Sequence, residues 1–288
     1  MLLIIMIAVS VLSAAAVALT GKYIGALLTL VGSFLGQLIL AFLFFVVVCA
    51  LVDRKKPQEK DSPFHRVMLG VYIQSVLPLL RLKIHTQGLE KIPAEGPFLL
   101  VCNHLSNLDP VILMRYFYKK KIVFVSKREN QTMPFVGSLM HKLRCPLINR
   151  ENDREALKSI IRCIQLVRED DAVIGLFPEG YVSLDGRLRQ FRSGAFKIAQ
   201  KTGIPIVVCT IRDTAESLSR LVKLRSSEVT VHLVDVISTE RLEGLSTQEI
   251  SQLVYETMIS DLGEERRCEE KGMHPDLQRK QMEQQSQN

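Results

Sequence analysis

Charge is almost absent from the first 52 residues, where Lys22 is the only charged side chain. Two apolar blocks, residues 1–20 and 24–52, lie on either side of it. About 20 apolar residues are enough for a helix to cross the hydrocarbon core of a bilayer. Each block reaches that length, so the two blocks are not expected to form an ordinary water-exposed surface. They predict a membrane-anchoring helical hairpin over residues 1–52.

A cleaved signal peptide is the main alternative, because LSAAAVALTG offers small residues for cleavage. No Lys or Arg precedes the first block, however, and a longer apolar block follows it, so the sequence favours the hairpin. Arg54, Lys55 and Lys56 follow the hairpin directly. By the positive-inside rule they indicate a protein of the cell membrane whose polar portion faces the cytoplasm. A hairpin confined to one leaflet would leave the same pattern, and the sequence leaves that choice open.

Paired cysteines and clustered histidines are lacking too. The six cysteines form no CxxC pair and the six histidines show no ligand spacing, which argues against disulfides and against a metal site. The net charge is +7, but no basic run with interleaved aromatic residues accompanies it, so the pattern does not indicate a nucleic-acid partner. An anionic bilayer surface or acidic substrates explain the basic balance better.

Beyond the hairpin, short apolar runs alternate with helical patterns. Residues 53–81 contain a polar linker and an apolar helix, which is expected to lie against the bilayer or to be buried over the next domain. A helix is expected over 152–168, and Ser246 with Glu249 forms a capping box before another. This alternation predicts a single α/β domain over 82–262, with a mostly parallel mixed sheet flanked by helices. A disordered polar tail is expected over 263–288. Strands are expected at 82–86, 98–102, 122–126, 146–149, 172–176, 206–211 and 229–234.

Polar residues with catalytic chemistry follow four of the expected strands. His104 and Asp109 follow FLLVC within the segment NHLSNLDP, and Lys127 follows IVFVS. Arg150 follows PLIN, and Glu179, within FPEG, follows the run AVIGL. Ligands of open α/β sheets bind outside the carboxyl ends of strands, so we expect these residues at one edge. Each alone is compatible with a capped loop, and the His–Asp spacing alone is close to a chance pattern.

Taken in order, these segments resemble the glycerolipid acyltransferase family, in particular its 1-acylglycerol-3-phosphate (lysophosphatidic acid) acyltransferases. NHLSNLD matches the NHx4D block of that family, KRENQTMPFVGSLMHKLRCPLINR the second block, FPEG the third and GIPIV the fourth. The resemblance extends from about residue 82 to residue 211. The ordered set is far more specific than any one motif, and bacterial members of the family commonly carry a membrane hairpin.

The resemblance implies transfer of an acyl chain from a thioester, on coenzyme A or acyl carrier protein, to the sn-2 hydroxyl of 1-acylglycerol-3-phosphate. The product would be phosphatidic acid for phospholipid synthesis. His104 would be the general base, and Asp109 would hold one ring N–H and stabilise the imidazolium. No protein nucleophile, metal or further cofactor is needed. Ser106 lacks the GxSxG elbow and is interpreted as a turn residue.

The resemblance also nominates residues that hold the acceptor. Arg150, with Lys127 as a second candidate, would bind the phosphate. Glu179 would hydrogen-bond the glycerol or order neighbouring donors. Gly137 would be needed for close backbone approach, or simply for a turn. The third block contributes three further substrate-binding candidates, Phe177, Pro178 and Gly180.

One departure from the family pattern concerns the headgroup. Family members often read FPEGTR, with the arginine counted among the phosphate ligands, whereas FPEGYVS places Val182 there. Three downstream arginines could supply the charge, namely Arg187, Arg189 and Arg192. Alternatively, the acceptor is another lysolipid, or the protein is a non-catalytic lipid-binding scaffold, which the intact His–Asp pair argues against. Val208 replaces a proline in the fourth block, with little expected consequence.

Overall fold

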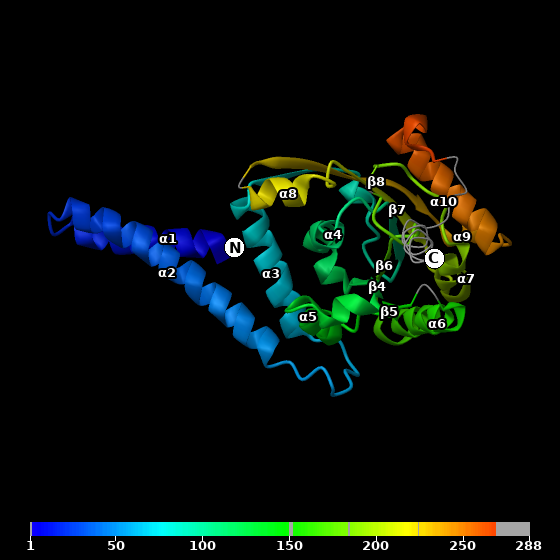
Figure 1. The fold of residues 1–288 in the computed structure, drawn as a ribbon, viewed down its shortest axis with the longest axis horizontal. Helices are drawn as coiled ribbons and strands as arrows, with labels where there is room; N and C mark the ends of the chain where they lie inside the picture. Colours follow the sequence, from blue (N-terminus) through cyan, green and yellow to red (C-terminus); the bar gives the residue numbers. More distant parts are fainter. Residues whose placement is uncertain (1, 150–151, 184, 224, 269–288) are drawn as a thin grey trace, which may run out of the picture.

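Two apolar helices precede one α/β domain in a computed structural model that describes residues 2–149, 152–183, 185–223 and 225–268 (Figure 1). The helices α1 (Leu2–Ala18) and α2 (Tyr23–Ala50) pack against each other as the expected hairpin. Among the described helices, α2 alone is long and apolar enough to cross a membrane, whereas α1 has 17 residues. The seating of the hairpin in a bilayer stays a prediction.

The helix α3 (Pro63–Leu79) joins the hairpin to the domain, and Figure 1 shows it between the hairpin and the sheet. It begins with Pro63 and ends one residue after Pro78, as expected from the inability of proline to continue a helix. The Tyr72 hydroxyl donates to the Ala41 carbonyl at 2.6 Å, and the Tyr72 and Phe45 rings lie 5.0 Å apart. These contacts fix the base of the hairpin to α3.

The central sheet is mixed and mostly parallel, as predicted. Its six described strands lie in the order β1-β8-β7-β2-β6-β3, and β7–β8 is the antiparallel pair. In chain order the strands are β1 (Leu82–Gln87), β2 (Leu99–Cys102), β3 (Val123–Phe124), β6 (Ile174–Leu176), β7 (Ile206–Arg212) and β8 (Ser227–Ile237).

Side chains alternate between two apolar layers on either face of the sheet. From β2, Leu99 and Val101 join the layer under α6, α7 and α10, whereas Leu100 and Cys102 join the layer under α3 and α4. This period of two is characteristic of a strand buried on both faces. The helices concerned are α4 (Asp109–Phe117), α6 (Asp153–Asp170), α7 (Lys197–Thr202) and α10 (Thr247–Leu262). The capping box that begins α10 is present as predicted, with Ser246 and Glu249 bonded reciprocally.

One predicted strand divides between two sheets. Residues 122–126 were expected as one strand, but Val125 donates to the Gly175 carbonyl of the main sheet, and Ser126 donates to the Pro146 carbonyl. Thus β4 (Ser126–Lys127) pairs with β5 (Leu147–Ile148) in a separate two-stranded sheet. Apolar periodicity does not specify the partner of a strand, so this change of sheet was not predictable.

The remaining described helices are short, namely α5 (Val136–Lys142), α8 (Ser217–Val222) and α9 (Thr239–Leu242). The first residues of the expected tail pack on the domain, because Leu188 donates to the Arg266 carbonyl and Cys268 donates to the Leu188 carbonyl. The rest of that expected tail, 269–288, lies outside the described residues.

Candidate active site

The loop after β2 is tied to β7 by the side chain of Asn103. The amide nitrogen of Asn103 donates to the Ile211 carbonyl at 2.9 Å, and its oxygen accepts from the Ile211 N–H at 2.8 Å. Asn103 is buried, so this pair of bonds is shielded from water. It holds the loop where the backbone ladder of β2 ends.

His104 is the next residue, and its ring is oriented by Asp109. The distance from His104 Nδ1 to Asp109 Oδ2 is 2.8 Å. Because a carboxylate only accepts hydrogen bonds, Nδ1 carries the proton and Nε2 is the basic nitrogen. The resemblance assigned this arrangement to the two residues, and the loop places them in the geometry that it needs.

Asp109 is fully buried as the first residue of α4, where the positive end of the helix dipole favours a carboxylate. Its Oδ2 also accepts from the backbone N–H groups of Leu105 and Ser106, at 2.7 and 2.8 Å. Ser106 Oγ in turn accepts from the Leu108 N–H at 3.3 Å, which is a turn contact. One carboxylate oxygen thus orders the loop and the imidazole together.

One face of the imidazole lies on Phe177, the residue that directly follows β6. The two rings stack with centroids 4.1 Å apart and planes 18° apart. Phe177 in turn stacks on Phe124 at 5.7 Å. The His104 side chain is only 13% exposed, so its basic nitrogen works in a site that is largely protected from water.

A cavity of about 440 Å³ opens beside His104, and Phe177 and Lys127 also line it. Tyr181 and Val182, which follow the FPEG segment of the third block, form part of its wall. Most of the remaining wall is apolar and comes from α3, α4, α5 and the residue after α5, including Ile73, Met114, Val136, Leu139, Met140 and Leu143. A base thus adjoins a compartment of the size and polarity that a hydrocarbon chain requires.

Glu179 is buried and is not part of the described wall of this cavity. Its Oε1 accepts from the His104 N–H at 2.9 Å, and its Oε2 accepts from the Arg189 N–H at 3.2 Å. Burial raises the pKa of Glu179 to about 8, against the lowering effect of these two N–H groups. Of the two roles expected for Glu179, these contacts match the ordering of neighbouring donors.

The proton on Glu179 predicts a pH-dependent stability. The folded protein holds this proton more tightly than the unfolded chain, whose carboxyl has a pKa near 4.5. The contribution of Glu179 to the unfolding free energy should therefore be complete below pH 4.5 and decline as the pH rises towards about 8. In Glu179→Gln this part of the decline should vanish, as denaturant titrations at several pH values would show. Identical slopes in parent and variant would contradict the raised pKa.

The two glycines among the predicted substrate-binding residues occupy positions where the backbone around the site excludes or disfavours a side chain. A Cβ on Gly137 would lie 2.0 Å from the Gln131 carbonyl oxygen and 2.7 Å from the Arg54 guanidinium. Arg54 donates to that same carbonyl at 2.6 Å, so the glycine lets the hairpin exit dock beside the segment that follows Lys127. Gly180 has a positive φ of 85°, which its turn requires.

The expected headgroup cations have different surroundings. Arg150 lies outside the described residues. Arg189 pairs with both oxygens of Asp185 at 2.8 and 2.9 Å and lies over the Tyr181 ring at 5.8 Å. Its charge is therefore balanced within the protein.

Pro178, another predicted substrate-binding residue, is buried, and its carbonyl accepts from the Arg192 N–H at 2.9 Å.

Three residues at the site had not been assigned roles from the sequence. Asn103 fastens the loop to β7, and the Ser183 N–H donates to the His104 carbonyl at 2.7 Å. Tyr181 contributes to the cavity wall. Asn103 and Ser183 lie within the quoted segments NHLSNLDP and FPEGYVS, which was the available signal, but their partners are more than 70 positions away in the chain.

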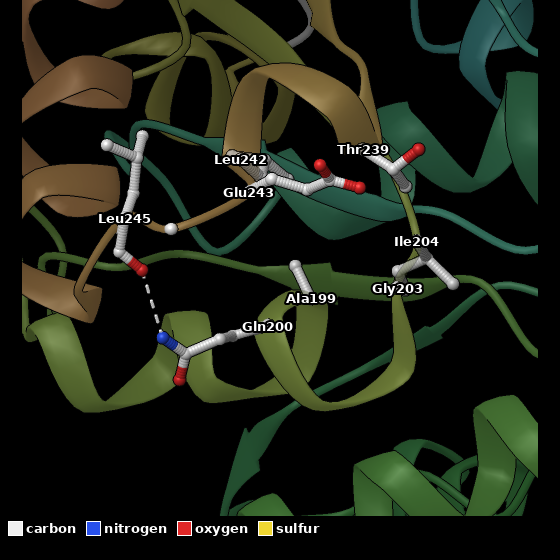
Figure 2. A pocket seen from close by; sticks show the side chains of 9 residues that line it. Ala199, Gln200, Gly203, Ile204, Thr239, Leu242, Glu243 and Leu245 are labelled. Carbon is white, nitrogen blue, oxygen red and sulfur yellow. Dashed lines mark hydrogen bonds between the residues drawn. The ribbon is translucent and has the colours of Figure 1, made fainter.

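A separate shallow hollow lies between α7 and the segment around α9 (Figure 2). It adjoins the start of β7 and the end of β8. The His104 loop lies at the opposite end of these strands. Gln200 donates to the Leu245 carbonyl at 3.0 Å across it. Among the described residues that line this hollow, Glu243 has the single ionisable side chain, so it offers no comparable base and carboxylate pair.

Comparison with known proteins gives concordant results. The acyltransferase family profile matches residues 83–212. A Borreliella burgdorferi protein named 1-acyl-sn-glycerol-3-phosphate acyltransferase is 26% identical over 197 residues, which cover 68% of this chain and 78% of that protein. A Mycoplasma genitalium protein named as a probable enzyme of the same kind is 30% identical over 203 residues, which cover 67% of this chain and 72% of that protein. The crystal structure of a Thermotoga maritima LPA acyltransferase has a similar fold, with a TM-score of 0.59 and 21% identity. The match covers 79% of this chain and 89% of that one.

Proposed function

Since the chain belongs to the acyltransferase family, we propose that it transfers an acyl chain from a thioester to the sn-2 hydroxyl of 1-acylglycerol-3-phosphate, giving phosphatidic acid for phospholipid synthesis. The observation that carries this proposal is the His104–Asp109 pair at the wall of an apolar cavity. The acyl donor is acyl-coenzyme A or acyl carrier protein, and the chemistry requires no metal or other cofactor.

The reaction follows from the orientation of the His104 ring. Nε2 takes the proton of the acceptor hydroxyl as the hydroxyl oxygen attacks the thioester carbonyl carbon. The new C–O bond forms, the C–S bond breaks, and the departing sulfur receives the proton from the imidazolium. Asp109, bonded to Nδ1, stabilises the positive charge while it resides on the ring. No covalent acyl-enzyme is needed.

The polar and apolar parts of the site suit the two substrates. The aliphatic end of the cavity, formed by side chains such as Leu139 and Leu143, receives the donor chain. Lys127 lines the same cavity on the side of the polar loop and provides a cation for a phosphate headgroup, with Arg150 as its expected companion.

Replacing Lys127 with glutamine should raise the KM for the phosphate-bearing acceptor about tenfold, because a charge-assisted bond to phosphate contributes roughly 1.5–3 kcal/mol. Turnover of a lysolipid without a net negative headgroup should change little. Initial rates against acceptor concentration would measure both. Lys158, on α6 and outside the described cavity wall, offers a matched control as Lys158→Gln. Equal KM values in parent and Lys127→Gln would remove Lys127 from the headgroup site.

A different lysolipid is the second candidate acceptor, favoured by one specific observation. Val182 and Tyr181 line the cavity at the third block, where the family often has an arginine. A panel of lysolipids with both thioester donors tests the choice. Preferred turnover of 1-acylglycerol-3-phosphate supports the proposal, whereas turnover of another headgroup alone would assign the enzyme to that acceptor.

The apolar hairpin supports a membrane location for this chemistry. The apolar α2 is flanked at its exit by Arg54, Lys55 and Lys56, which suit a cytoplasmic membrane surface. We therefore propose a membrane-anchored enzyme whose catalytic domain faces the cytoplasm, where both thioester donors are available.

A further inference from the structure

A second apolar compartment lies between the hairpin and α3, and we call it the hairpin groove. It has a volume of about 380 Å³ and is lined by side chains of α1, α2 and α3, among them Leu3, Leu38, Phe42 and Val76. Figure 1 shows α3 beside the end of the hairpin that is nearer to the domain. The groove is distinct from the cavity that contains His104.

The hairpin groove offers a ligand no unused polar group among its described lining residues. Tyr72 and Ser75 are its polar members, and both hydroxyls are engaged. The Tyr72 hydroxyl donates to the Ala41 carbonyl at 2.6 Å, and the Ser75 hydroxyl donates to the Val71 carbonyl at 2.8 Å. Such a lining fits a hydrocarbon chain and no headgroup.

The groove and the catalytic cavity share part of their walls. Leu69 and Ile73, one turn apart on α3, line both compartments, and so does Val111 on α4. Val111 lies two residues after Asp109, in the first turn of α4. A molecule with its tail in the groove therefore needs to pass only this ridge of side chains to bring its polar end to His104.

The proposed reaction brings two acyl chains together, one on the donor and one on the acceptor, and so needs two apolar compartments. We propose that the hairpin groove binds the acyl chain of the acceptor lysolipid while the donor chain lies in the catalytic cavity. This inference rests on the proposed function. The groove suits the acceptor because its walls are apolar and partly exposed, with Phe42 of α2 60% exposed and Val76 of α3 40% exposed. A lysolipid is dissolved in the bilayer, whereas the thioester arrives on a water-soluble carrier.

Filling the groove tests the proposal. In Val76→Trp, the KM for a long-chain 1-acyl acceptor should rise about tenfold, which corresponds to the lost burial of roughly two methylene groups. The kcat and KM for a short-chain acceptor should stay unchanged, which also shows that the variant is folded. The donor chain-length preference should stay unchanged too. Leu28→Trp is a matched control, because Leu28 is 69% exposed on α2 and is not part of the described groove lining.

A second measurement reports binding without turnover. A lysolipid with a photoreactive diazirine at the end of its chain, added to His104→Ala in vesicles, should label peptides of α2 and α3. Labelling of α5 instead, or an acceptor KM that Val76→Trp leaves unchanged at every chain length, would overturn the inference and leave the groove to bystander lipids. Failure of the parent to acylate any lysolipid would refute the proposed function itself, which the acceptor panel shows separately.

Discussion

Replacing His104 with alanine is expected to lower kcat for acyl transfer by about three orders of magnitude, within the range typical of a lost general base. Nδ1 of the ring is bonded to Asp109 and one ring face lies on Phe177, so Nε2 remains as the basic nitrogen of a side chain that lines the cavity. The KM for the acceptor should change far less, since alanine removes no phosphate ligand. Steady-state kinetics with saturating thioester would measure both.

The chain contains its own control for this substitution. His232 on β8 pairs with Asp261 of α10, with 2.7 Å between Nδ1 and Oδ1, but it is outside the described lining of the catalytic cavity. His232→Ala therefore removes a second His–Asp pair of similar geometry and should leave kcat within about twofold of the parent, because it removes no group that handles protons in the reaction. Equal losses in the two variants would point to general destabilisation. Full activity in His104→Ala would remove this residue as the base.

The second large effect is expected for Asp109→Asn. The amide can still accept hydrogen bonds from Leu105 and Ser106 through its oxygen, but it no longer provides a negative charge beside His104. With the amide oxygen in the place of Oδ2, Nδ1 keeps its hydrogen bond, and what is lost is the negative charge that stabilises the imidazolium. We expect kcat to fall by about 10²- to 10⁴-fold, as for other catalytic histidines that lose their carboxylate.

Comparison with Asp109→Ala separates chemistry from stability. Alanine leaves the buried N–H groups of Leu105 and Ser106 without their acceptor, which costs about 1–3 kcal/mol for each unsatisfied group. Asp109→Asn should therefore unfold at nearly the parental denaturant concentration, and Asp109→Ala at a clearly lower one. A parental kcat in folded Asp109→Asn would contradict the role of the carboxylate in orienting and charging His104.

Much of this architecture was predictable because it depends on local patterns. The uninterrupted apolar run before His104 indicated a buried strand, and in the structure its side chains alternate between the two apolar layers. The capping box at Ser246 and Glu249 marked the start of α10 correctly. Each signal lies within a few residues of the feature that it specifies.

Features that depend on distant pairing could not be predicted. The role of Asn103 requires β2 to lie beside β7, and the role of Glu179 requires β6 to bring its end to the His104 backbone. The sequence identified Glu179 as functional without distinguishing a glycerol ligand from a buried support. The departure of Ser126 from the main sheet depends on a partner, Pro146, that local periodicity does not reveal.

The central claim is that His104 drives acyl transfer to a lysolipid at the membrane. Its most direct test is phosphatidic acid formation, followed by mass spectrometry, from 1-acylglycerol-3-phosphate and acyl-coenzyme A or acyl carrier protein thioester in vesicles. We predict steady product formation by the parent and by His232→Ala, and a rate about a thousandfold lower for His104→Ala. The account would be contradicted by absence of product from the parent with either donor, or by equal rates for the parent and His104→Ala.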